Sequence, residues 1–118
     1  MNIERLGEIA TWLEAGAPEK DGAVGFDMNE WGVISVGGRV NKCGSVCCIG
    51  GAAVQWYEKG IVGYFSDSAC RVLDLDAHTG NELFYPAFAS YDKITPAMAA
   101  IVVRDLIATG EVNWDLVL

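Results

Sequence analysis

Hydrophobic side chains recur every three or four positions in four separate stretches of the chain, a spacing that places them on one face of an α-helix. These stretches are residues 2–15, 44–59, 66–75 and 95–108. A shorter helix, capped by Asp76 and ending near Phe84, is expected between the third and the fourth. The pattern predicts a mainly α protein, a compact bundle of four to five helices.

Local signals mark the ends of the first and last helices. Asn2 is expected to be the N-cap of the first helix, and Gly16 follows its last apolar position as a stop. Thr95 is followed by Pro96, the combination of cap and first helical residue that favours a helix start. Gly110 is expected to end that last helix.

The helix expected over residues 44–59 carries glycines and cysteines where most helices carry larger side chains. Each residue of the Gly50-Gly51 pair costs a helix interior about 1 kcal/mol relative to alanine. The usual compensation is the close approach of another backbone, so we expect this helix to be central and tightly crossed by a neighbour. Ser45 or Asn41 is a candidate cap for it.

Two short segments alternate between apolar and polar residues, as strands do. Residues 32–41 contain β-branched side chains on both sides of a Gly-Gly pair, which predicts a small β-hairpin leaning on the helices. The tail also alternates and is expected to dock back onto the core through Val112, Trp114 and Leu116.

Length and composition are those of one folded domain spanning residues 1–118. Hydrophobic residues make up 52% of the chain, which argues against disorder. Charged residues occur every few positions in the N-terminal segment, unlike a signal peptide, and no apolar run approaches the ~20 residues of a membrane helix. We therefore expect a cytoplasmic protein with no membrane contact, whose four cysteines are reduced.

The charge balance is strongly acidic, with 16 acidic against 8 basic side chains and a net charge of −8. The basic residues are scattered and no two are adjacent, which argues against direct nucleic-acid binding because such proteins cluster Lys and Arg. An acidic surface favours solubility, or a protein partner with a basic surface.

Three motifs, taken in order, resemble a group of small uncharacterised proteins of bacteria and their phages. Residues 43–52 (CGSVCCIGGA) resemble a C-G-[ST]-x-x-C-I-x-G pattern, and residues 73–86 an L-x-L…L-F-x-P segment. Residues 94–96 and 109–114 resemble a T-P…T-G-x-V-x-W ending. The likeness covers most of residues 1–15 and 43–115. It implies the same helical fold and a bacterial or phage source, and it assigns no catalytic residue.

Cys43 is the strongest candidate for chemistry, because the start of a helix favours a thiolate. Its Cys-Gly-Ser context is loosely similar to that of the nucleophile in papain-like proteases. The hypothesis is a thiol hydrolase in which Cys43 is the nucleophile, His78 the base, and Asp76 or Asp92 the orienting acid. Two facts oppose it: the chain is short, and His78 is expected near a helix start, which disfavours its protonation.

A second alternative is a zinc-stabilised module. Cys43, Cys47, Cys70 and His78 supply four ligand types that zinc accepts, but the paired spacing of structural zinc sites is absent. Cys70 pairing with Cys47 or Cys48 as a disulfide is a further option. The competing interpretation is that the cysteines line a packed helix face and hold no metal.

The leading hypothesis is a non-enzymatic interaction protein that needs no cofactor or metal. Its concrete form is an anti-CRISPR-like inhibitor of a host-defence nucleoprotein, occupying a basic groove. Oligomeric state is left open. Acidic and aromatic side chains in predicted loops are the candidate contacts: Asp27, Glu30, Trp31, Tyr64 and Tyr91.

Overall fold

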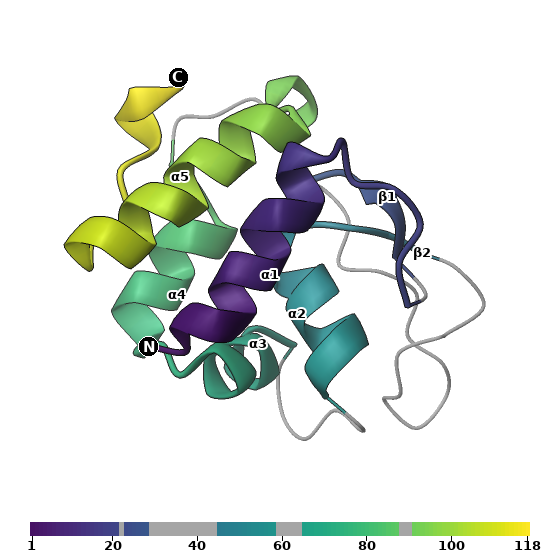
Figure 1. Ribbon diagram of the computed structural model, residues 1–118. Coiled ribbons are helices and arrows are strands. Elements are labelled where there is room, and N and C mark those ends of the chain that lie inside the picture. The colour runs from purple at the N-terminus through teal and green to yellow at the C-terminus, as the bar shows by residue number, and fades with distance from the viewer. Residues whose placement is uncertain (22, 29–44, 59–64, 88–90) are drawn as a thin grey trace.

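The computed structural model describes residues 1–21, 23–28, 45–58, 65–87 and 91–118 (Figure 1). Within them the helices are α1 (Ile3–Glu14), α2 (Ile49–Tyr57), α3 (Phe65–Leu73), α4 (Ala77–Phe84) and α5 (Pro96–Thr109). The strands are β1 (Ala23–Phe26) and β2 (Ser45–Cys47), and the 3-10 turns are η1 (Tyr91–Lys93) and η2 (Trp114–Leu116). The mainly helical prediction is confirmed. No helix in this part of the chain is long and apolar enough to cross a membrane.

Helix α2 forms the later part of the Gly/Cys-rich helix predicted over residues 44–59, and it lies in the core. Helix α2 contacts α1, α3, α4 and both strands. Its Ile49, Ala52, Ala53 and Val54 are completely buried. Small residues let the surrounding elements approach this helix from several sides, so the core forms around it.

Helices α1 and α5 lie side by side, although they are far apart in the sequence (Figure 1). Their facing surfaces are apolar and fully buried, with Leu6 and Ile9 on α1 and Val103 and Leu106 on α5. Two apolar stripes that cover each other in this way supply most of the stability of both helices.

An ion pair spans the outer edge of the α1–α5 contact. The Arg104 guanidinium donates to both Glu14 carboxylate oxygens, from Nη2 at 2.8 Å and from Nε at 3.2 Å. The hydrogen bond from Arg104 lowers the pKa of the Glu14 carboxyl group. Because both side chains are exposed, the pair fixes the alignment of the helices more than it stabilises them.

Two apolar residues inside the helical stretches predicted over residues 2–15 and 95–108 are exposed. Ile3 is 55% and Ile101 is 51% exposed. Ile3 is the first residue of α1. Ile101 lies about 100° around α5 from the buried Val102, outside the face that packs.

The start of the central helix was predicted wrongly. Residues 45–47, expected to be its first turn, form strand β2, which pairs in parallel with β1 from Ala23 to Phe26. This pairing holds the backbone extended, so α2 begins only at Ile49. Its N-cap is Cys48, whose Sγ accepts the Gly51 N–H at 3.2 Å. The β-hairpin expected at 32–41 lies outside the described residues.

Three N-caps and one C-cap predicted from sequence are confirmed, whereas the candidate cap Ser45 lies in β2. Asn2, Asp76 and Thr95 each accept the backbone N–H three residues further on, at 3.0, 2.7 and 3.2 Å. Gly110 ends α5 in the left-handed conformation, with φ at +79°. Such caps depend on side chains close in sequence, which is why they could be read without knowing the fold.

Replacing Gly7 with alanine is expected to raise the free energy of unfolding by about 0.5–1 kcal/mol. Gly7 lies inside α1, and a Cβ there would meet only the Arg104 Nη1, at an ordinary contact distance of 3.9 Å. Urea denaturation measures the change. A loss of stability would show that the space beside Gly7, at the contact between α1 and α5, is too small for a methyl group.

Candidate binding cleft

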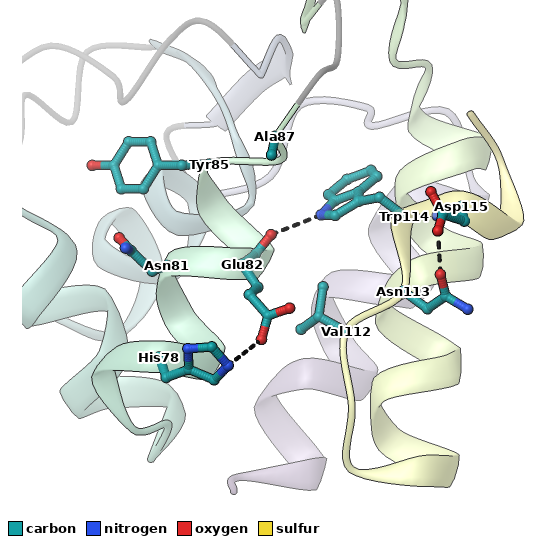
Figure 2. Close-up of a pocket in the computed structure, with 9 residues that line it drawn as sticks. All are labelled: His78, Asn81, Glu82, Tyr85, Ala87, Val112, Asn113, Trp114 and Asp115. Atoms are coloured by element: carbon teal, nitrogen blue, oxygen red, sulfur yellow. Dashed lines mark hydrogen bonds and ion pairs between the residues drawn. The ribbon is translucent and has the colours of Figure 1, made fainter.

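Trp114 anchors the tail segment, residues 111–118, against α4. Its indole is only 8% exposed, and its Nε1 donates to the Glu82 carbonyl oxygen at 2.9 Å (Figure 2). The predicted docking of the tail is therefore confirmed for Trp114. It is wrong for Leu116, which is 51% exposed because η2 is a helical turn whose side chains do not alternate.

A cleft of about 400 Å³ lies between α4 and the tail segment. We call it the α4–tail cleft. Its lining residues, drawn in Figure 2, are His78, Asn81, Glu82, Tyr85, Ala87, Val112, Asn113, Trp114 and Asp115. Leu83 and Phe84, on the opposite face of α4, are buried in the core.

The chemistry of this cleft is acidic and aromatic. Glu82 and Asp115 supply carboxylates, and two asparagines supply carboxamides. A smaller hollow of about 260 Å³ shares His78 and Glu82 with the cleft and adds Glu111. Among the described residues, no Lys or Arg lines either space. The cleft therefore presents a negative potential to a ligand.

His78 is paired within the cleft by its own helix. Its Nε2 lies 2.8 Å from the Glu82 Oε1, one turn along α4 (Figure 2). The acids proposed to orient His78 were Asp76 and Asp92. Instead, Asp76 accepts the Thr79 N–H as N-cap, and the acid paired with His78 is Glu82.

The hydrogen bonds at the N-cap of α4 also change the pKa of the Asp76 carboxyl group. Hydrogen bonds from Thr79 lower the pKa of the Asp76 carboxyl group, and the nearby His78 adds to the effect. A carboxyl group whose pKa is depressed by folding stabilises the folded state above its unfolded-state pKa. That contribution is lost only as the pH falls through the folded-state pKa. The start of α4 is therefore secure at neutral and mildly acidic pH.

The argument that placed Cys43 at a helix start is wrong. Helix α2 begins at Ile49, and the residue at its N-cap is Cys48, whose fully buried Sγ accepts the Gly51 N–H. Cys43 itself lies outside the described residues. The helix dipole that was expected to favour a Cys43 thiolate therefore acts further along the chain.

Of the four proposed zinc ligands, only Cys70 and His78 have described side chains, because Cys43 and the Cys47 side chain lie outside that set. The Cys70 Sγ is a free thiol 3.9 Å from the Asp76 carbonyl oxygen, and burial raises its pKa. In the described part of the chain, no three His, Cys, Asp or Glu side chains gather as a metal site would require.

Two of the five proposed interaction residues are described. Asp27 follows β1 and is partly buried, and Tyr91 lies in η1, partly buried against the core. Glu30, Trp31 and Tyr64 lie outside the described residues. The proposed loop surface stays a prediction, whereas the α4–tail cleft was missed because its two walls come from segments far apart in sequence.

A second hollow, of about 540 Å³, runs along α1. Trp12 and Pro18 line it together with acidic side chains and two cations, Lys20 and Arg104. Both cations are engaged, since Lys20 Nζ lies 4.6 Å from the centre of the Trp56 ring and Arg104 binds Glu14. This hollow therefore has mixed charge, and the α4–tail cleft is the more selective site for a cation.

The comparisons with known proteins add no relative to this picture. No protein-family model, curated protein sequence or solved structure matches the chain at a significant level.

Proposed function

We propose that this protein is a non-enzymatic binding protein that engages a basic surface of a protein partner through the α4–tail cleft. The observation that carries the proposal is the lining of that cleft. It holds the carboxylates of Glu82 and Asp115 together with the Trp114 ring, and no described Lys or Arg lines it. A partner's cationic side chain complements such a site in both charge and shape.

The charge of the rest of the surface supports the proposal. Only one of the 16 acidic side chains, Glu30, lies outside the described residues, compared with three of the 8 basic ones. Four of the five described basic side chains already interact within the chain. They are Arg5 with the Val72 carbonyl, Lys20 with Trp56, Arg71 with Glu58, and Arg104 with Glu14. Most of the charge presented outward is therefore negative, which steers a basic partner toward the protein.

We propose that the partner is a host-defence nucleoprotein with a basic groove. This protein would then be an anti-CRISPR-like inhibitor. An acidic protein that occupies such a groove excludes the phosphate backbone that the groove otherwise binds. The negative charge and the resemblance to small phage and bacterial proteins support this version. The cleft defines the contact whichever basic partner is bound.

The double variant Glu82→Gln/Asp115→Asn is expected to weaken binding of a basic probe about tenfold, because it removes two acceptors of charge-assisted hydrogen bonds. The probe is a fluorescein-labelled nona-arginine peptide, followed by fluorescence anisotropy at pH 7.5 over a range of salt concentrations.

The matched control for this experiment is Asp21→Asn/Asp92→Asn. It removes the same charge from two exposed positions outside the cleft. Asp21 has a φ of +48°, a conformation that asparagine tolerates. The control is expected to weaken binding about twofold or less, through the long-range field alone. Equal losses in the two double variants would show that the charge acts diffusely and that the cleft is not the contact.

A further inference from the structure

The hollow of about 540 Å³ along α1 is a second place where a partner can bind. It follows α1 from Glu4 to Ala15, and α1 lies on the outside of the molecule (Figure 1). We propose that this hollow, the α1 groove, binds a basic amphipathic helix of a protein partner. The contact is separate from the α4–tail cleft, with which the α1 groove shares no residue.

The shape of the α1 groove suits a helix. Gly7, Thr11 and Ala15 line it at intervals of four residues, so these small residues share one side of α1. Small side chains at a helix contact shorten the distance at which a second helix can pack. From Glu4 to Ala15 the groove follows about 17 Å of α1, which a partner helix of about three turns matches.

The carboxylates of the α1 groove favour a partner helix with cations at helical spacing. Glu4, Glu8 and Glu19 line the groove, and all three are exposed. Glu4 and Glu8 lie one turn apart on α1. Two cations one turn apart on a partner helix therefore face both carboxylates, whereas successive side chains of an extended peptide point in opposite directions.

The two cations of the α1 groove do not balance its carboxylates. Arg104 donates to both oxygens of Glu14, which is not a lining residue, so this pair adds no net charge. Lys20 adds one positive charge, and its Nζ lies 4.6 Å from the centre of the Trp56 ring. The groove thus contains both signs of charge with an excess of carboxylates, which complements lysine or arginine on the flanks of a partner helix.

Two labelled peptides of equal charge test whether the groove prefers a helix. The first consists of repeated Lys-Ala-Ala-Ala-Lys-Ala-Ala units and is about 20 residues long, enough to form a helix in solution. The second has one central alanine replaced by proline, which breaks the helix and keeps every charge. Fluorescence anisotropy is expected to show about tenfold tighter binding of the helical peptide. Equal affinities would overturn the assignment of a helix.

A charge-removing double variant tests whether the α1 groove is the contact. Glu4→Gln/Glu19→Gln is expected to weaken binding of the helical peptide about five- to tenfold, because it removes two lining carboxylates. Glu8 is left in place because it accepts the hydrogen bond of the Tyr57 hydroxyl. The control Asp21→Asn/Asp92→Asn removes the same charge outside the groove and is expected to cost about twofold or less.

The outcomes distinguish the α1 groove from the α4–tail cleft. Glu82→Gln/Asp115→Asn leaves the groove intact, so its affinity for the helical peptide is expected to stay within about twofold of wild type. Loss of affinity in this variant but not in Glu4→Gln/Glu19→Gln would place the helix in the cleft, which overturns the groove and supports the proposed function. Equal losses in all the double variants would overturn both contacts. Circular dichroism confirms that each variant is folded.

Discussion

Replacing Trp114 with alanine is expected to lower the free energy of unfolding by about 3–5 kcal/mol, the range for truncating a large buried aromatic side chain. The indole is 8% exposed, and its Nε1 donates to the Glu82 carbonyl oxygen at 2.9 Å. The variant loses the packing of the ring and this hydrogen bond together. It also loses one wall of the α4–tail cleft, so its affinity for the nona-arginine peptide is expected to decrease as well.

Urea denaturation followed by circular dichroism measures the stability of the Trp114 variants. Trp114→Phe is the matched control, because it keeps an aromatic ring and removes only the N–H donor. It is expected to cost about 1–2 kcal/mol, from the lost hydrogen bond and the smaller ring. An alanine variant as stable as wild type would show that residues 111–118 do not hold onto α4 in solution.

Replacing Gly80 with alanine is expected to destabilise the protein by about 1–3 kcal/mol, the cost of overpacking a filled interior. Gly80 is buried in α4, and a Cβ there would overlap with the Cys70 Sγ on α3. The close approach of α3 and α4 therefore depends on the missing side chain. This result is opposite in sign to that expected for Gly7→Ala, although both glycines lie inside helices.

A second substitution isolates the cause of the Gly80 effect. Cys70→Ala removes the sulfur that a new Cβ would overlap, so Gly80→Ala is expected to cost little or nothing in a Cys70→Ala background. The double-mutant cycle, measured by urea denaturation, gives the coupling between the two positions. Coupling near zero would show that Gly80 is required for another reason than the contact with Cys70.

Features that depend on neighbours in sequence could be predicted well. The N-caps Asn2, Asp76 and Thr95 and the C-cap Gly110 all hold in the structure, because each one satisfies backbone groups within a few residues. The apolar stripes of the longest helices were predicted for the same reason. Helical spacing shows which face is buried, but it does not show where that face stops, and the apolar Ile101 lies outside it.

Features that depend on distant residues were not predictable in this way. Residues 45–47 begin with Ser45, a candidate helix cap, yet they form β2 because β1 pairs with them in parallel. A strand of three residues is too short for its alternation to be recognised. The α4–tail cleft depends on the same kind of long-range contact, made here by Trp114 and the Glu82 backbone.

The pairing of α1 with α5 has a consequence for how the protein is made. The apolar face of α1 is completed by a helix that begins only at Pro96, so α1 emerges from the ribosome several seconds before its partner at ~5–20 residues per second. Closing so long a stretch of chain is entropically unfavourable and slows folding. Until α5 is made, the apolar face of α1 that carries Leu6 and Ile9 lacks the cover that α5 provides. We therefore expect the nascent chain to expose a hydrophobic stripe suited to chaperones during most of its synthesis.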